Sequence, residues 1–153
     1  MMNVIIRRAT LKDLDILIDW RMEVLHEVFS VSQNQSLKAL EEANRIYYQN
    51  ALLNEEHIAC FAYQEENIIA CGGICLYKEM PSPDNPSGTC AYLMNIYTRS
   101  RFRGQGVGKQ VVSWLVQEAV QRKVTKIYLE TSEAGRALYH ELGFQPMIDY
   151  MKL

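Results

Sequence analysis

The part of this chain that most constrains its fold is a glycine-rich segment, Arg-Gly-Gln-Gly-Val-Gly at residues 103–108. An apolar run ending at Tyr97 is typical of a β-strand, and the amphipathic run at residues 107–120 is typical of a helix, so the pattern predicts a strand-to-helix turn. Glycines let the backbone approach a ligand closely. Free N–H groups at a helix start favour an anion, and Arg103 and Lys109 would add positive charge. The sequence therefore predicts a phosphate or pyrophosphate site.

The spacing of these glycines excludes two better-known phosphate-binding loops. Residues 104–109 lack the four-residue gap before a final Gly-Lys-Ser/Thr that defines a Walker A loop. They also miss the G-x-G-x-x-G spacing of dinucleotide-binding folds. A glycine-rich turn that only caps a helix remains open as an alternative.

Composition and charge narrow the class of protein. An apolar content of 48% fits a single domain over residues 1–153 with a real core. The formal net charge of −2, with acidic and basic residues mixed along the chain, gives no broad basic face for nucleic acid. No apolar run reaches the roughly 18 residues of a membrane span, and the N-terminus lacks the apolar core of a signal peptide. We therefore expect a cytoplasmic protein that binds neither nucleic acid nor membrane.

The cysteines are expected to be buried, reduced thiols. They lie in or beside apolar, strand-like runs, without a C-x-x-C pair or a histidine at metal-ligand spacing. We therefore expect neither a metal site nor a disulfide at Cys60, Cys71, Cys75 and Cys90.

Hydrophobic periodicity predicts an alternating series of strands and helices. Thr10 is a candidate N-cap for the first helix, with Asp13 in its first turn. Gly72 and Gly73 indicate a bulge or a close approach of another element. The expected strands are residues 4–8, 58–63, 68–77, 90–97 and 126–130, with one or two more in 144–153. The expected helices are residues 11–29, 37–53, 106–122 and 133–142, the last ending at Gly143. Residues 80–89 are expected to be a surface loop, with a substrate gate as the alternative.

The glycine-rich turn matches the pattern Arg/Gln-x-x-Gly-x-Gly/Ala, with Arg103, Gly106 and Gly108 in the fixed places. It resembles the acyl-CoA pyrophosphate loop of the GNAT superfamily of N-acetyltransferases. The element order β-α-α-β-β-β-α-β-α-β is similar to the order in that family. The resemblance implies an α+β GNAT acyl-CoA N-acyltransferase fold, with a mixed, mostly antiparallel sheet flanked by helices on both faces.

The resemblance also implies which residues contact acetyl-CoA. The pyrophosphate would lie on the loop, and the pantetheine arm would pair with the end of the preceding strand, which splays from its neighbour. Ser132 stands where family members often place a cofactor-contacting Asn, and a serine side chain reaches less far than an asparagine. The implied cofactor-binding residues are Ile96, Tyr97, Thr98, Arg103, Gly104, Gln105, Gly106, Val107, Gly108, Lys109 and Ser132.

Two residues are candidates for proton transfer. Tyr139 lies in Leu-Tyr-His-Glu-Leu-Gly-Phe at residues 138–144, which looks like the family's closing segment and places Tyr139 as proton donor to the coenzyme A sulfur. A helix tyrosine that only packs is the alternative. Glu130 is the candidate base for the amine, although a solvated strand-end charge is the more ordinary role. Structural or solvent-exposed roles are favoured for the histidines His26, His57 and His140.

The acceptor pocket is expected near the two early helices. Acids and aromatics there would suit a cationic amine, whereas Arg21 could instead hold a substrate carboxylate. The candidate pocket residues are Trp20, Arg21, Glu23, Glu27 and Tyr92.

The function implied is direct transfer, in a ternary complex, of an acetyl group from acetyl-CoA to a primary amine of a small molecule or peptide, with no metal. A non-catalytic acyl-CoA sensor and a nucleotide-binding protein are the alternatives. The resemblance leaves a homodimer open, because family members commonly dimerise through their late strands.

Overall fold

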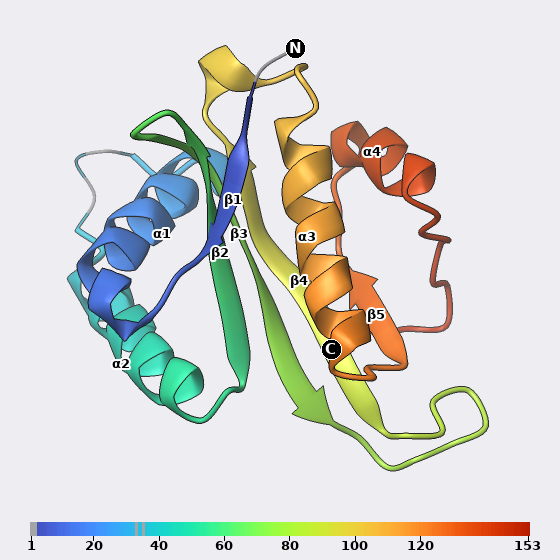
Figure 1. Cartoon of the computed structure of the whole chain (residues 1–153). Coiled ribbons are helices and arrows are strands. Elements are labelled where there is room, and N and C mark those ends of the chain that lie inside the picture. Colours follow the sequence, from blue (N-terminus) through green and yellow to red (C-terminus); the bar gives the residue numbers. More distant parts are fainter. Residues whose placement is uncertain (1–2, 33, 35) are drawn as a thin grey trace.

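The computed structural model describes residues 3–32, 34 and 36–153 and contains a five-stranded sheet in the order β1-β2-β3-β4-β5 (Figure 1). Strands β1 to β4 are antiparallel neighbours, and β5 is parallel to β4. A parallel neighbour needs a crossover connection, which is why a helix separates these two strands in the chain. The strands are β1 Ile5–Arg8, β2 His57–Gln64, β3 Asn67–Lys78, β4 Thr89–Thr98 and β5 Lys126–Leu129.

Helices cover both faces of the sheet, as the resemblance implied. Figure 1 shows α1 and α2 on one side of the sheet and α3 and α4 on the other. Each face buries its own apolar cluster, one centred on Phe61 and Trp20 under α1 and α2, the other on Leu115 and Ile74 under α3. The helices are α1 Leu14–Val28, α2 Lys38–Leu53, α3 Val107–Gln121 and α4 Arg136–Glu141, with short 3₁₀ turns at Leu11–Asp13, Ser100–Phe102 and Glu133–Gly135.

The predicted cap at Thr10 is confirmed as a capping box. The Thr10 hydroxyl accepts a hydrogen bond from the Lys12 N–H, and the Asp13 carboxylate accepts one from the Thr10 N–H at 2.8 Å. These bonds satisfy N–H groups that a helix start leaves unpaired, and they fix where the first helical segment begins.

Gly72 and Gly73 lie at both a bulge and a close approach, as predicted. The register between β3 and β4 shifts between Cys71 and Gly73. A Cβ atom on Gly72 would lie 2.6 Å from Val111 Cγ1, and one on Gly73 would lie 2.6 Å from His57 Nε2. Glycine at position 72 therefore lets α3 pack closely on β3. Glycine at position 73 lets the side chain of His57, from β2, lie close to the β3 backbone.

The final strand predicted within residues 144–153 is wrong, because the structure has no strand there. Pro146 lacks the N–H that a ladder requires, and β5 offers a partner of only four residues. The end of the preceding helix is confirmed at Gly143, whose φ of 93° is the left-handed conformation that ends many helices.

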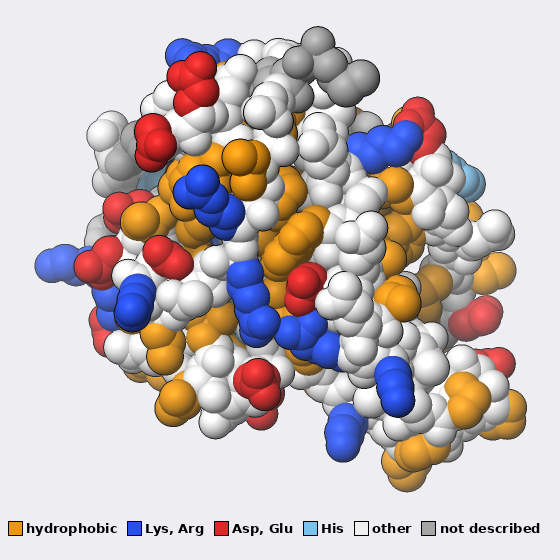
Figure 2. Space-filling model, in the orientation of Figure 1, with side chains coloured by type: hydrophobic (Ala, Val, Ile, Leu, Met, Phe, Trp, Pro, Cys, Tyr) orange, Lys and Arg blue, Asp and Glu red, His pale blue; other side chains and the backbone are white. Residues whose placement is uncertain are grey.

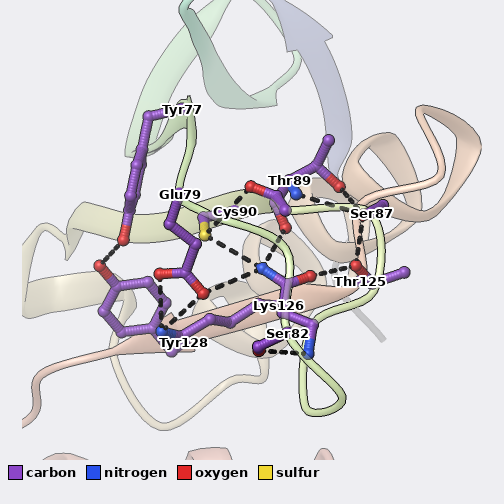
Figure 3. A network of polar contacts seen from close by, with 11 residues as sticks. Tyr77, Glu79, Ser82, Ser87, Thr89, Cys90, Thr125, Lys126 and Tyr128 are labelled. Carbon is purple, nitrogen blue, oxygen red and sulfur yellow. Dashed lines mark hydrogen bonds and ion pairs between the residues drawn. The ribbon is translucent and has the colours of Figure 1, made fainter.

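The loop before β4 is anchored at the end of the sheet where β4 and β5 begin (Figure 3). Asn85, only 1% exposed, donates hydrogen bonds to Glu79 Oε1 at 3.1 Å and to the Thr89 carbonyl at 3.3 Å, and accepts one from the Thr125 hydroxyl. Lys126 forms an ion pair with Glu79 at 3.2 Å. The network ties this loop to both strands, which favours the surface-loop prediction over a gate.

The surface carries side chains of both charges. Acidic and basic side chains are mixed over the face drawn in Figure 2. Across the part of the chain that the structure describes, no helix has both the length and the apolar content to cross a membrane. All four cysteines are free thiols, and Cys75 is the one that is only partly buried.

Candidate functional site

The candidate site begins where β4 and β5 separate. The two strands pair from Cys90 with Lys126 to Leu93 with Leu129, but β4 continues to Thr98. Among the described residues, this outer edge of β4 has no strand partner beyond Leu93. Backbone N–H and C=O groups there are available to an extended ligand.

A cavity of about 870 Å³ occupies this gap and extends to the start of α3. It is bounded by β4, the glycine-rich turn, the start of α4 and parts of α1. Its lining includes Arg21, Tyr92, Met94, Asn95, Ile96, Tyr97, Thr98, Arg103, Gly104, Gly106, Val107, Gly108, Lys109, Glu130, Thr131, Ser132, Leu138 and Tyr139. The cavity thus includes every residue predicted to bind the cofactor or to transfer a proton except Gln105, whose side-chain amide donates to the Arg101 carbonyl at 3.3 Å.

The glycine-rich turn has the backbone that an anion cradle requires. Gly104 and Gly106 have φ of 71° and 80°, and Gly106 is the N-cap of α3 without a side-chain cap. A Cβ atom at either glycine would meet nothing within 4 Å, so the turn needs glycine for its conformation and not for lack of space. The first N–H groups of α3 therefore face an open region.

Arg103 is held by a carboxylate from α1. Its Nη2 lies 2.7 Å from Glu27 Oε1, and its Nε donates to the Thr98 carbonyl at 2.8 Å. The Tyr97 hydroxyl also donates to Glu27, and these two hydrogen bonds, from Tyr97 and then Arg103, lower the pKa of the Glu27 carboxyl. Glu27 therefore does not line the cavity as an acceptor residue; it positions Arg103 instead.

Tyr139 and Glu130 lie on the α4 and β5 sides of the cavity. Burial raises the pKa of the Tyr139 phenol, so this side chain is a protonated donor at neutral pH. Its ring packs edge-on against Phe144 at 5.8 Å. Glu130 is exposed and close to Tyr92, whose pKa is raised by burial and then by the Glu130 charge. Tyr139 and Glu130 also line a second cavity of about 820 Å³, together with residues 142–148.

The acceptor-side prediction is only partly correct. Arg21 and Tyr92 line the cavity. Trp20 is 5% exposed, because its ring packs between Phe61 and Tyr97 in the core. The Glu23 carboxylate instead accepts two hydrogen bonds from Arg99, from Nη2 at 2.9 Å and from Nε at 3.1 Å.

Asn95 and Met94 are cavity residues that the sequence did not identify. Asn95 has a φ of 59°, and the register with β3 passes from Met94 opposite Gly73 to Tyr97 opposite Cys71. The side chain of Asn95 is turned toward α1 by this irregularity. The sequence carries no clear signal for it, since Asn in a strand is not specific for a bulge.

The histidines have no direct place in the cavity. His57 is 2% exposed, and its Nδ1 lies 2.7 Å from the Tyr47 hydroxyl, so its role is structural as predicted. His140 borders the second cavity, and His26 Nδ1 lies 3.4 Å from the Val31 carbonyl.

Comparisons with known proteins agree with this geometry. A predicted acetyltransferase from Clostridium acetobutylicum, solved with acetyl-CoA, is 28% identical with a TM-score of 0.87, covering 99% of this chain and 96% of that one. A GCN5-related N-acetyltransferase from Ralstonia eutropha JMP134, at 19% identity and a TM-score of 0.82, shares the fold over 99% of this chain and 98% of its own.

Sequence comparison gives the same family. Glucosamine 6-phosphate N-acetyltransferase from Arabidopsis thaliana is 25% identical over 105 residues, which are 67% of this chain and 68% of that protein. The model of the Acetyltransferase (GNAT) family matches residues 18–144, from α1 through the closing Gly-Phe pair. The chain therefore belongs to the GNAT family of acetyltransferases.

Proposed function

We propose that this protein transfers an acetyl group from acetyl-CoA to a primary amine, by direct transfer within a ternary complex. The observation that carries the proposal is the convergence of three features on one cavity: the open edge of β4, the glycine-rich start of α3 and the Tyr139 side chain. The related Clostridium protein solved with acetyl-CoA supports the choice of donor.

The residues present fit acetyl-CoA as co-substrate. The loop at residues 103–109 would hold its pyrophosphate through the free N–H groups of α3, and the open backbone of Ile96, Tyr97 and Thr98 would pair with the pantetheine arm. Bound acetyl-CoA supplies an activated acyl carbon, at which a new C–N bond replaces the C–S bond. Ser132 lies in the same cavity and lines its wall beside α4.

The side chains of this protein would move two protons. Tyr139 would donate its phenolic proton to the departing sulfur, a role for which its raised pKa keeps it protonated. Glu130 would accept the proton that the amine nitrogen loses. The net products are an amide and the free thiol of coenzyme A.

Thiol release from acetyl-CoA, with mass spectrometry of the acetylated product, tests this function over a panel of polyamines, amino acids, aminoglycosides and peptides. Thermal-shift measurements with acetyl-CoA, CoA, ATP and NAD accompany it. We expect stabilisation by acetyl-CoA and CoA and acceptor-dependent thiol release. Tight CoA binding without release over the whole panel would instead support a non-catalytic sensor, and stabilisation by ATP or NAD alone would contradict both.

A further inference from the structure

Arg21 extends from α1 and lines the cavity. Its Nε donates to Asn44 Oδ1 at 3.1 Å, and its Nη1 donates to Asn95 Oδ1 at 3.0 Å. A guanidinium carries five N–H groups, and these bonds use two of them. The planar group is thus fixed in place with donors left for a ligand.

Both asparagines that hold Arg21 are themselves fixed. Asn44 Nδ2 donates to the Leu40 carbonyl at 2.8 Å, which leaves Asn44 Oδ1 directed at Arg21. Asn95 lies in the irregular part of β4, with its backbone at a φ of 59°. Three elements, α1, α2 and β4, therefore position a single guanidinium at the cavity.

Arg21 lacks the carboxylate partner that neighbouring arginines have. Arg45, Arg99 and Arg103 each form an ion pair with a carboxylate of α1. For Arg21, no carboxylate within residues 3–32, 34 and 36–153 lies at ion-pair distance.

The groups around Arg21 are electrically neutral. Burial raises the pKa of the Tyr48 phenol and of the Cys71 and Cys75 thiols. Burial, and then the Arg21 charge, lower the pKa of His57 to about 4, so its imidazole is uncharged at pH 7. A half-buried cation among neutral groups attracts an anion more strongly than one in bulk water.

We propose that Arg21 binds an oxyanion, a carboxylate or a phosphate, carried by the acceptor amine. This proposal rests on the proposed acetyltransferase function and names its acceptor class. Glu130, in the same cavity, would attract the ammonium end before deprotonation. The two opposite charges would orient an acceptor that carries both an amine and an anionic group, and would disfavour a polyamine without an anionic group.

Matched acceptors test the proposal on the unmodified protein. One pair is an amino acid and its carboxamide, and the other is glucosamine 6-phosphate and glucosamine. The expected result is a kcat/KM about 10- to 100-fold higher for the anionic member of at least one pair, the range for charge-assisted hydrogen bonds. The pair with the larger ratio identifies carboxylate or phosphate. Equal values, or a preference for the neutral member, in both pairs would overturn the proposal.

Calorimetric titration of the same four compounds into the CoA-loaded protein separates this proposal from the general function. Binding of neither anionic compound, by a protein that binds CoA and acetylates other amines, would reject the role of Arg21 and leave the acetyltransferase function intact. Failure to bind CoA or to release thiol with any amine would contradict the acetyltransferase function itself.

Variants assign the effect to Arg21. In Arg21→Gln, the KM for the preferred anionic acceptor should rise about 10- to 100-fold, and the ratio of kcat/KM between this acceptor and its neutral counterpart should fall toward one. Arg21→Lys, which keeps the charge but loses the planar fork, should be intermediate. Arg7→Gln is the control, because Arg7 stacks on Tyr63 outside the cavity. An equal loss for charged and neutral acceptors in Arg21→Gln would show a structural role only.

Discussion

At the scale of single residues, Tyr139 is a phenol in a partly buried position at the edge of the cavity. Burial disfavours its ionised form and raises its pKa, so the hydroxyl keeps its proton at neutral pH. Packing against Phe144 holds the ring without occupying the hydroxyl. These properties suit a proton donor to sulfur.

Substitution of Tyr139 by Phe is expected to lower kcat by roughly ten-fold or more, because the proton donor is lost while the ring packing remains. Acetyl-CoA affinity, measured by calorimetric titration, should change little. Steady-state kinetics with the best acceptor gives the comparison, and an unchanged kcat would remove this role from Tyr139.

His57 makes stability depend on pH. Its pKa is lowered to about 4 in the folded protein by burial and then by Arg21, whereas an unfolded histidine has a pKa of about 6.5. As pH falls, the unfolded chain therefore takes up a proton at a higher pH than the folded protein does. The contribution of His57 to stability is complete above about pH 6.5 and is lost as pH falls toward 4. The loss attributable to His57 is on the order of 3 kcal/mol.

Denaturant unfolding at pH 7, 6 and 5 should therefore show a steeper loss of unfolding free energy in the wild type than in His57→Gln. The carboxyls of Glu27 and Glu79, whose pKa values are lowered, titrate in both proteins and cancel in the comparison. Parallel pH profiles for the two proteins would show that His57 is not the titrating group.

At the scale of elements, the start of α3 depends on the left-handed conformation of Gly106. Any other residue at that φ costs about 1–2 kcal/mol, and its Cβ would stand where a ligand must approach the backbone. The Cβ would clash with nothing in the free protein, so the loop would fold and the ligand contact would be lost.

We expect Gly106→Ala to weaken acetyl-CoA binding at least about ten-fold while lowering the unfolding free energy by only about 1–2 kcal/mol. Gly143→Ala is the matched control, since Gly143 also has a positive φ and open space around its Cα but lies outside the cavity. Calorimetric titration and chemical denaturation measure the two effects. Equal loss of binding in both variants would contradict an assignment to the cradle.

At the scale of the whole molecule, the pair β4 and β5 is closed at one end and open at the other. The Asn85 network joins the loop before β4 to the chain entering β5 at the closed end (Figure 3). The cavity lies at the opposite end, beyond the pairing of Leu93 with Leu129. The stabilising network and the cavity therefore lie at different ends of the same strands.

Replacing Asn85 by Ala should lower the unfolding free energy by about 3 kcal/mol, because the Thr89 carbonyl and the Thr125 hydroxyl lose their bonds to this buried side chain. Below the melting temperature, the KM for acetyl-CoA should stay unchanged. The control is Asp84→Ala at the exposed neighbouring position. A rise in KM for acetyl-CoA without loss of stability would place this network in ligand binding.

Predictability differed between the two sides of the site. The backbone of the glycine-rich turn and the cap at Thr10 were foreseen because these residues act on their own backbone, within a few residues. The places of Trp20 and Glu23 were not foreseen, because both lie on one amphipathic helix and the sequence does not show what each side chain contacts. Packing against Phe61 and pairing with Arg99 distinguish them.

The sequence by itself determined the order of most helices and strands and the place of the glycine-rich turn, since periodicity and backbone conformation are local properties of the chain. Only the tertiary structure decided that Glu27 holds Arg103 and that Asn95 holds Arg21, because these contacts join residues 76 and 74 positions apart. It also decided that residues 144–153 form no strand, because a strand depends on its neighbour as well as on its own residues. Local conformation is encoded where it occurs, whereas the partner of a charged side chain depends on which segments the completed sheet brings together.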